Sequence, residues 1–532
     1  MAGIVGIDLG TTKCAVAVWQ NGEPRIIPDA SGENIIPSVV AFDSAKGKWV
    51  VGHAAKQLAV TDPQAAIYSA KRLMGRRFSD DAVRNALADM HILYALEKSK
   101  VRRDGIDVVV GDKHLTPQEV SAKLLAHLKA TAEAELGQEV TEAVITVPAY
   151  FHDSQRQATR DAGRLAGLEV KRVLNEPTAA CLAFGFQRLA DERKKVAVYD
   201  LGGGTFDISI LEIGRGPFRV LATNGDDYLG GDDLDWLIVD WAIDQLGGNE
   251  QTQIKEDVHA LARLRAAAEA AKKDLSSQEK TVIKISGALS TDIKITDLSL
   301  ELTREKLEEL TEPLIKRTLK PCEQALHDAR VNTSDIKEVL LVGGQTRMPA
   351  IRRAVRDFFG IEPNTSVKPE EVVALGAAVQ SAIMAGVATN LKLADVVPLS
   401  LGVNSKGMMD TIIARNTPIP VHKTKNYSTD LDNQDTVEIS IYQGEGIAVA
   451  ENNKLGGFLL KGILPAPAGE PDIEVTFHVD QDGILHVTGK DLKTGNSHET
   501  TITDSMRLSD AEIEAMIQGG SAASESIDYH PG

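Results

Sequence analysis

The chain is short of several residue types, and each shortage excludes a class of protein. Its three cysteines, Cys14, Cys181 and Cys322, are too few for a disulfide framework, so we expect buried thiols in a reducing compartment. Aromatic residues make up only 4% of the chain, which argues against a stacking platform for single-stranded nucleic acid. No run of about 18 apolar residues predicts a membrane span. The N-terminus also lacks the basic segment of a secretory signal, and we expect a cytoplasmic protein.

Positive charge is also in short supply. Lys and Arg number 58 against 76 Asp and Glu, which gives a net charge of −18. A chain this acidic is a poor general binder of nucleic acid or of anionic membranes, so we expect neither as a partner. With 43% hydrophobic and 25% charged residues it has an ordinary globular balance, and 532 residues predict several domains.

The pattern of the chain changes once. Up to residue 386, strand-like and helix-like segments alternate, as in an α/β domain; examples are a strand at 144–147, a helix after an Asp153 cap, and a helix over 256–274. Residues 387–396 lack a clear period and predict a linker. Residues 397–508 contain short alternating strands without helices, which predict an antiparallel β-sandwich. Residues 509–532 predict a short helix after a capping box at Ser509, followed by a disordered tail.

An internal repeat is the most informative feature of the first domain. A strand ending in Asp8, a turn of Gly10, Thr11 and Thr12, and a second strand recur 192 residues later, where Asp200 ends the first strand. The second turn consists of Gly202, Gly203, Gly204 and Thr205. Glycine turns expose backbone N–H groups to phosphate, and two carboxylates beside phosphates favour Mg²⁺. Either copy alone would read as an ordinary tight turn, but two matched copies predict two lobes that face one nucleotide. The loop is not a Walker A motif.

A second cluster would suit a base and a ribose. Four residues share one predicted helix face, and a glycine pair followed by an arginine offers close approach and stacking. These are Glu269, Lys272, Lys273, Ser276, Gly343, Gly344 and Arg347. The helix face by itself could equally be a solvated charged surface.

Ordered motifs over residues 3–508 resemble the seventy-kilodalton heat-shock chaperones of the DnaK type. The motifs are Gly6-Ile-Asp-Leu-Gly-Thr-Thr12, Ala70-Lys-Arg-Leu-Met-Gly75, Val147-Pro-Ala-Tyr-Phe151, Asn175-Glu-Pro-Thr-Ala-Ala180, Asp200-Leu-Gly-Gly-Gly-Thr-Phe-Asp207, Leu341-Val-Gly-Gly-Gln-Thr-Arg-Met-Pro349 and Pro398-Leu-Ser-Leu-Gly402. The resemblance implies an actin-like ATPase of two lobes, followed by a peptide-binding β-sandwich.

The resemblance also implies roles for residues around the nucleotide. Asp8 and Asp200 would hold hydrated Mg²⁺, with K⁺ as a further candidate ion. Phosphates would be bound by Gly10, Thr11, Thr12, Lys13, Gly202, Gly203, Gly204 and Thr205. Lys71 would orient the attacking water, and Glu176, Asp207 and Thr205 would complete the polar network around it. The second cluster described above would clamp adenosine.

Roles in coupling and in partner binding follow from the same resemblance. Pro148, Arg156 and Asp395 match a relay between the domains, and Arg172 matches a position used by J-domain partners. A J-domain co-chaperone, a nucleotide exchange factor and unfolded polypeptides are therefore the expected partners. The residues that match the peptide pocket are Val403, Tyr427, Ser428, Val437, Ile439 and Ile484, although their alternation alone would predict only sandwich core.

The chain departs from the family pattern at several places. Residues 509–532 are too few for the family's helical lid, so we expect weak peptide affinity and fast release. Lys406 and Asp430 stand near positions that usually carry apolar or small residues, and Lys392 interrupts an apolar linker. Lys273 replaces a usual Arg, and His152 replaces a usual Asn.

The function predicted from the sequence is an ATP-dependent polypeptide chaperone. One alternative is a nucleotide-gated holdase or co-chaperone whose turnover is dispensable. A second alternative is a small-molecule kinase of the actin-like superfamily, although no residue identifies an acceptor base.

Overall fold

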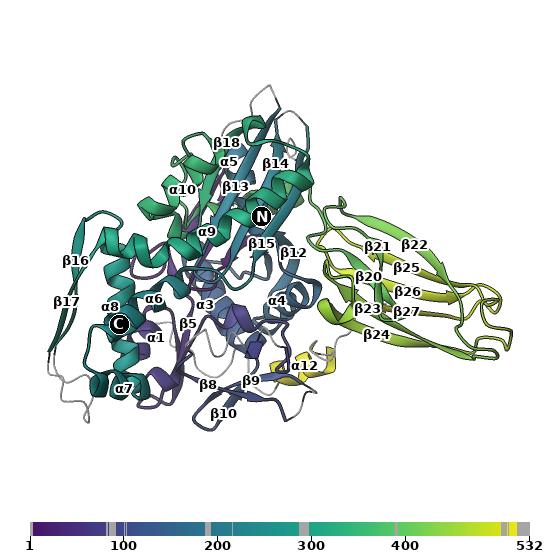
Figure 1. Ribbon diagram of the computed structural model, residues 1–532, viewed down its shortest axis with the longest axis horizontal. Coiled ribbons are helices and arrows are strands. Elements are labelled where there is room, and N and C mark those ends of the chain that lie inside the picture. The colour runs from purple at the N-terminus through teal and green to yellow at the C-terminus, as the bar shows by residue number, and fades with distance from the viewer. Residues whose placement is uncertain are drawn as a thin grey trace.

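The computed structural model describes residues 4–80, 83–84, 92–100, 102, 104–186, 193–214, 216–286, 297–388, 392–501, 508 and 510–518. Figure 1 shows a broad body of sheets and helices and a narrower stack of strands that projects from its side. The broad body contains the α/β segment, and the projecting stack is formed by β20 to β27. Among the described residues, no helix combines the length and the apolar character that crossing a membrane would require.

Each lobe of the broad body is built on one mixed sheet. The first has the order β12-β11-β1-β2-β3, with β4 on β2; the bounds are β1 Ile4–Leu9, β2 Lys13–Gln20, β3 Glu23–Ile27, β4 Ile36–Pro37, β11 Glu142–Val147 and β12 Glu169–Asn175. The second has the order β18-β13-β14-β15-β19; the bounds are β13 Lys194–Leu201, β14 Phe206–Ile213, β15 Phe218–Asp226, β18 Ile336–Val342 and β19 Leu393–Ala394.

The predicted duplication is confirmed at the level of the sheets. In both, an antiparallel hairpin (β1–β2 or β13–β14) has a parallel neighbour on one side, β11 or β18, and an antiparallel third strand on the other. The two hairpin turns therefore occupy equivalent places at the carboxyl ends of parallel strands.

Helices and small sheets surround the two large sheets. The helices are α1 His53–Thr61, α3 Pro117–Leu136, α4 Asp153–Leu165, α5 Glu176–Phe186, α6 Gly231–Asp244, α7 Gly248–Glu256, α8 Val258–Asp274, α9 Arg304–Ala329, α10 Pro349–Phe359, α11 Val372–Met384 and α12 Asp510–Gln518. The small sheets contain β5 Val39–Asp43, β6 Lys48–Val51, β7 Ala66–Tyr68, β8 Ala95–Lys98, β9 Ile106–Val110, β10 Lys113–Leu115, β16 Lys280–Ser286 and β17 Asp297–Thr303. The helix expected from residue 256 begins at Val258, because the Asp257 side chain caps it.

Helices α5 and α11 join the lobes through a shared core. That core combines strand residues of both lobes, such as Val144 and Val198, with Cys181 of α5 and Val379 of α11. Gly376 of α11 crosses α5 so closely that a Cβ there would lie 1.8 Å from the carbonyl oxygen of Ala179. The three cysteines are free and buried, where core thiols had been expected for two of them.

The β-rich segment is the predicted sandwich of two antiparallel sheets. One has the order β21-β20-β23-β24 and the other β22-β25-β26-β27. The bounds are β20 Leu401–Ser405, β21 Met408–Ile413, β22 Val421–Tyr427, β23 Thr436–Gln443, β24 Asn453–Lys461, β25 Ile473–Val479, β26 Leu485–Asp491 and β27 Ser497–Thr501. Alternate residues of the facing sheets, such as Ile441 and Phe477, form its core.

The linker is partly regular, which the sequence did not predict. Leu393 and Ala394 form β19, which extends the second lobe's sheet by pairing in parallel with β15. The Phe218 N–H donates to the carbonyl oxygen of Lys392 at 2.7 Å, so the expected interruption at Lys392 does not prevent backbone pairing.

The sandwich packs against the broad two-lobed body through its β25–β26 turn. Asp482 of the turn pairs with Arg160 of α4, and the Leu485 N–H donates to the Asp153 carboxylate at 2.8 Å. Asp153 was predicted to cap α4, but His152 is the N-cap residue. The Asp153 carboxylate instead reaches across to the sandwich.

The predicted C-terminal helix is present as α12, which begins at Asp510. It packs on the first lobe, where Leu508 and Ile513 join the hydrophobic core and Asp510 pairs with Arg164 at 2.7 Å. Ser509 and residues 519–532 lie outside the described residues.

Candidate nucleotide site and coupling surface

The turns of the two repeated hairpins meet face to face. A Cβ on Gly203 would lie 2.2 Å from the Thr12 side chain, and one on Gly204 would lie 2.5 Å from Thr11. Glycine is therefore required because the two turns approach so closely. Both turns line one cavity of about 70 Å³ together with Asp8, Lys71, Glu176, Asp200 and Lys13.

Four carboxylates gather in and beside this cavity with few positive charges to balance them. Burial and then Glu176 raise the pKa of Asp8 to about 7. Burial and the neighbouring acids Glu176 and Asp207 raise the pKa of Asp200 well above its usual range, and burial and Glu176 do the same for Asp207. The backbone N–H of Tyr150 donates to Asp207 at 3.0 Å. The cluster is therefore a strong site for added positive charge.

Lys71 is a buried cation that faces the cluster. It lies in the short 3₁₀ helix Ala70–Leu73, is buried, and donates to Glu176 at 2.6 Å. Its ammonium group also lies 5.6 Å from the centre of the Phe151 ring. The structure thus brings together the predicted catalytic residues Lys71, Glu176 and Asp207 from three different elements.

The predicted adenosine residues line an adjoining cavity of about 210 Å³. Its walls include Glu269, Lys272, Lys273, Ser276, Gly344 and Arg347; Gly343 lines the cavity between the two hairpin turns. Lys272 is not a surface charge, because it is buried and pairs with Asp235 at 2.7 Å. The interpretation of this helix face as merely solvated is therefore wrong for Lys272.

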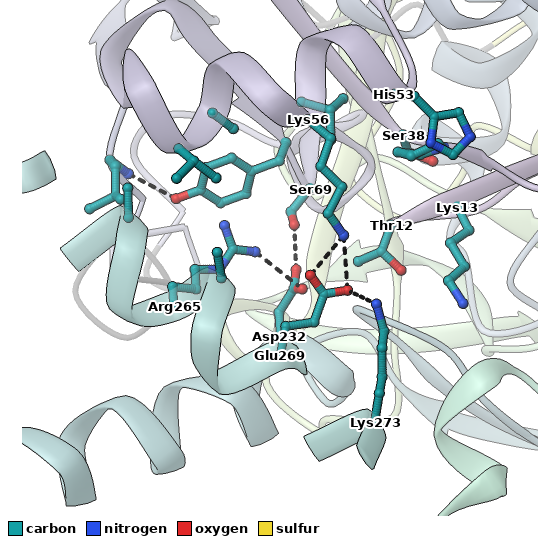
Figure 2. Close-up of a pocket in the computed structure, with 18 of the residues that line it drawn as sticks. Thr12, Lys13, Ser38, His53, Lys56, Ser69, Asp232, Arg265, Glu269 and Lys273 are labelled. Carbon is teal, nitrogen blue, oxygen red and sulfur yellow. Dashed lines mark hydrogen bonds and ion pairs between the residues drawn. The ribbon is translucent and has the colours of Figure 1, made fainter. Parts of the chain in front are cut away.

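Glu269 ties the two lobes together beside this cavity. It accepts hydrogen bonds from Lys273 of its own helix at 2.5 Å and from Lys56 of α1 at 2.7 Å, as Figure 2 shows. Burial raises the pKa of Glu269, but the two ammonium groups outweigh burial and hold that pKa well below its ordinary value. Beyond this bridge lies a further cavity of about 310 Å³ between α1 and α8.

Glu370 is a site residue that the sequence did not reveal. Its carboxylate accepts two hydrogen bonds from Arg347, at 2.8 and 2.7 Å, and its Oε1 lies 3.8 Å from Lys13 Nζ. It thus fixes the plane of the guanidinium that was predicted to stack on a base. The two residues are 23 positions apart, and nothing in the sequence indicated the contact.

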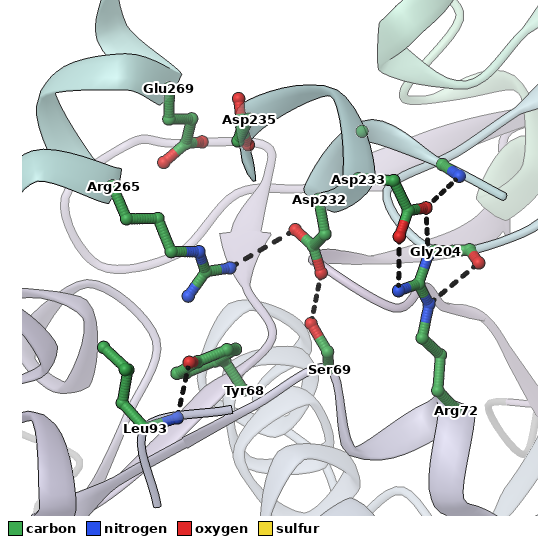
Figure 3. Close-up of polar contacts among 12 residues, drawn as sticks. Tyr68, Ser69, Arg72, Leu93, Gly204, Asp232, Asp233, Asp235, Arg265 and Glu269 are labelled. Atoms are coloured by element: carbon green, nitrogen blue, oxygen red, sulfur yellow. Dashed lines mark hydrogen bonds and ion pairs between the residues drawn. The ribbon is translucent and has the colours of Figure 1, made fainter. Parts of the chain in front are cut away.

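A second group of missed residues holds the lobes together around the hairpin turns, as Figure 3 shows. Arg72 donates to Gly204 O at 2.9 Å and to both oxygens of Asp233, at 3.1 and 2.6 Å. Ser69 donates to Asp232, which also accepts from Arg265 at 3.4 Å. Arg72 and Ser69 belong to the first lobe and their partners to the second, so these two sets of contacts connect the lobes across the cleft.

The predicted relay residues lie between the nucleotide cleft and the sandwich. Arg156 donates to Asn175, the residue before Glu176, at 2.7 Å, and to the carbonyl oxygens of Phe151 and Ala149 at 3.1 and 3.2 Å, beside Pro148. Its guanidinium packs over Gly483 of the sandwich turn.

The linker end of the relay is anchored as well. Asp395 accepts from Thr178 of α5 at 3.2 Å, and its charge acts on Arg156. Arg172 donates to the carbonyl oxygen of Gln481 at 3.4 Å, so it faces the sandwich in this arrangement. His152 is buried beside Arg76 and Arg156, and burial lowers its pKa well below the usual range.

Four of the predicted peptide residues take part in the core of the sandwich. Val403 and Ile439 belong to that core, and Tyr427 and Val437 are partly buried against it. Ser428 follows Tyr427 and donates to the carbonyl oxygen of Pro471.

Ile484 does not join this group. It lies in the β25–β26 turn, at the opposite end of β25 from Ile473, which is the strand partner of Tyr427. At about 3.3 Å per residue, the seven-residue strand separates the two ends by roughly 20 Å.

Two lobes face each other around an acidic cleft lined by glycine turns, and β19 connects the second lobe to the sandwich. This architecture is that of a nucleotide-dependent protein with a separate binding domain. The family model of the Hsp70 protein matches residues 4–528. The chain is also 49% identical over 519 residues to the chaperone protein dnaK of Cyanidioschyzon merolae (strain NIES-3377 / 10D), which covers 97% of this chain and 84% of that protein. The chain therefore belongs to the Hsp70 family.

Family membership supports a chaperone among the functions weighed from the sequence. The protein is an ATP-dependent molecular chaperone, and it is an ATPase that binds nucleotide. The kinase alternative is set aside, since the family match extends through the β-sandwich that a kinase left unexplained.

Proposed function

We propose that residues 1–386 bind and hydrolyse Mg²⁺-ATP in the cleft between the paired hairpins, and that residues 397–508 bind extended apolar polypeptide segments. Residues 387–396 would connect the two domains, and residues 509–532 would follow them. The acid cluster around Lys71 carries this proposal, because its charge suits a magnesium nucleotide and its geometry suits phosphoryl transfer.

A divalent cation fits the donors that the chain presents. Asp8 and Asp200 line the same cavity as the glycine turns, and the pKa values of both carboxyls are raised for want of positive charge. Carboxylate oxygens, phosphates and waters are the ligands that Mg²⁺ prefers. When bound, the ion would neutralise charge on the phosphates.

The chain's own residues would then supply position and charge. Backbone N–H groups of both turns, with Thr11, Thr12, Lys13 and Thr205, would hold the phosphate oxygens. Lys71, fixed by Glu176, would orient the attacking water beside the γ-phosphoryl group, and Asp207 would hold the water's other side. Such preorganised charge dominates phosphoryl transfer.

The relay explains how hydrolysis could change the grip of the sandwich. Arg156 contacts Asn175, next to Glu176, and also packs on the turn that carries Asp482. A shift of Glu176 on loss of the γ-phosphate would move Arg156 and loosen the sandwich from α4. Peptide exchange would be fast when the domains are docked and slow when they are apart.

Partners and location follow as proposals from the family. A J-domain co-chaperone would act near Arg172 and β19, and a nucleotide exchange factor would open the cleft held by the Lys56–Glu269 bridge. The three buried, free cysteines support a reducing compartment, for which we propose the cytoplasm.

Steady-state ATP turnover, measured with and without an apolar peptide, tests this function. We expect turnover that needs Mg²⁺ and rises with peptide. An ATP turnover rate that does not change when peptide is added would show that hydrolysis is not coupled to peptide binding, which contradicts the proposal. Lys71→Ala distinguishes the ATP-driven chaperone from the holdase alternative. If this variant assists refolding as well as the original chain does, ATP turnover is dispensable.

A further inference from the structure

Three of the chain's 12 histidines stand in one row across the sandwich. His422 of β22 is the direct strand partner of His478 on β25, and His478 is the direct partner of His486 on β26. Their ring centres are 6.1 Å apart for the first pair and 5.5 Å for the second, and the rings of the second pair are nearly parallel, at 27°. The three strands lie side by side in Figure 1.

The row lies on the outer face of its sheet. Phe477 and Val479, the neighbours of His478 along β25, are fully buried in the sandwich core, while His478 itself is exposed. Because side chains alternate along a strand, all three imidazoles point away from that core. Packing of the core therefore does not explain why three histidines occupy these positions.

The spacing of the row suits a metal ion. Directly opposed residues on antiparallel strands have Cβ atoms about 5 Å apart, so two opposed imidazoles can direct ring nitrogens at one ion. Imidazole is a preferred ligand of Zn²⁺, Ni²⁺ and Cu²⁺. Protonation of the whole row would instead place like charges opposite one another, which is unfavourable.

Acidic groups border one end of the row. Asp480 Oδ2 lies 3.4 Å from His486 Nε2, and Asp153 of α4 lies close enough for the charge of His486 to act on its carboxyl. A carboxylate against a ligating imidazole orients the ring and strengthens its binding. A cation is therefore favoured at the His486 end of the row over the His422 end.

We propose that His478 and His486 bind a Zn²⁺, Ni²⁺ or Cu²⁺ ion across β25 and β26, with Asp480 orienting His486 and water completing the coordination. In the part of the chain that the structure describes, no three potential ligands already surround one point. The site is thus a two-histidine site on an exposed face, distinct from the nucleotide cleft.

Binding there would reach the contact between the domains. Asp480 accepts backbone hydrogen bonds from Asp482 and Ile484, at 2.8 and 3.0 Å, so it shapes the turn that meets α4. An ion that fixes His486 would hold Asp480 and this turn more rigidly. Hydrogen exchange at residues 480–486 should therefore slow when the metal is added.

The test is a calorimetric titration of the full chain with ZnCl₂ and, separately, NiCl₂. The chain is first treated with chelator, and excess Mg²⁺ is kept present to occupy the acidic cleft. We expect one ion to bind in the micromolar range. His478→Asn and His486→Asn should each weaken binding about tenfold or more, and His422→Asn much less. Binding should also weaken as pH falls, because imidazole binds metal only when neutral.

His498→Asn is the matched control. His498 lies on β27 of the same sheet, but its ring stacks on Phe458 of the other sheet, so its loss should leave metal binding unchanged. Affinity in His478→Asn equal to that of the original chain, or an equal loss in His498→Asn, would overturn the proposal. Thermal unfolding without metal should be the same in all variants, which separates lost ligands from lost structure.

Discussion

Lys71 and Glu176 form a buried ion pair, with a 2.6 Å contact between side chains that are 6% and 10% exposed. The pair joins a short 3₁₀ helix of the first lobe to the start of α5. The charge of Glu176 also raises the pKa values of Asp8, Asp200 and Asp207. Lys71 therefore offsets the charge of the carboxylate that acts on all three.

Lys71→Ala should therefore abolish most hydrolysis while nucleotide still binds. Removal of one preorganised charge typically costs about 10²–10³ in rate. Single-turnover hydrolysis of prebound ATP measures the chemical step, and fluorescent-nucleotide titration measures affinity. Lys46→Ala, at an exposed turn lysine, is the control and should leave both unchanged. A rate within threefold of the original chain would show that Lys71 is not catalytic.

Lys56→Ala should speed ADP release. Lys56 and Glu269 form a bridge across the mouth of the cleft, but the lysine is 44% exposed, so the pair is worth only about 0.2–1 kcal/mol. We expect ADP release to be about two- to fivefold faster. Stopped-flow measurement of the dissociation of a fluorescent ADP gives this rate. Lys316→Ala removes an exposed pair with Glu312 within α9, away from the cleft, and should leave release unchanged. Equal release rates in Lys56→Ala and the original chain would show that the bridge does not limit opening.

Gly376→Ala should destabilise the two-lobed body. The new methyl group would meet the Ala179 carbonyl oxygen at 1.8 Å where α11 crosses α5, and backbone must move to admit it. Overpacking of this kind costs about 3 kcal/mol. Denaturant unfolding measures the loss. Gly248→Ala, at the start of α7 with no atom within 4 Å of the new methyl group, is the control and should not destabilise the protein. Equal midpoints for the two variants would contradict the packing argument.

Local pattern was enough to predict the paired hairpins, because Asp8, Asp200 and the glycine turns are recognisable within ten residues of chain. Contacts between distant segments were not predictable. Arg72 and Asp233 are 161 residues apart, and each alone is an ordinary charged residue. Glu370 was missed for the same reason.

Two other sequence predictions were limited in the same way. Alternation shows which face of a strand a residue occupies, but not which end of the sheet, so the predicted peptide residues include Ile484, which lies at the other end of β25 from the partner of Tyr427. Asp153 fits the sequence pattern of a cap, yet its partner Leu485 lies 332 residues away. Which acceptor its carboxylate uses depends on how the domains pack.

Docking of the sandwich should strengthen as pH falls from 7 to 5. Burial beneath the sandwich turn raises the pKa of Asp153 to about 6 in the docked arrangement, whereas an exposed aspartate has an ordinary value near 3.9. The docked form therefore binds the proton more tightly. The stabilisation from this group is present below the undocked value and is lost as pH rises through about 6. Between pH 7 and pH 5 the docking constant should rise about tenfold.

Asp153→Asn tests this link directly. Its amide oxygen can still accept the Leu485 N–H, but it does not titrate, so the pH dependence between 5 and 7 should disappear. Energy transfer between dyes at Lys46→Cys and Lys461→Cys would report docking, in a Lys71→Ala background with ATP. Asp472→Asn, in the sandwich away from α4, should keep the original pH profile, since Asp472 contacts Asn426 and not the ATPase domain. A profile unchanged by Asp153→Asn would show that another group controls docking.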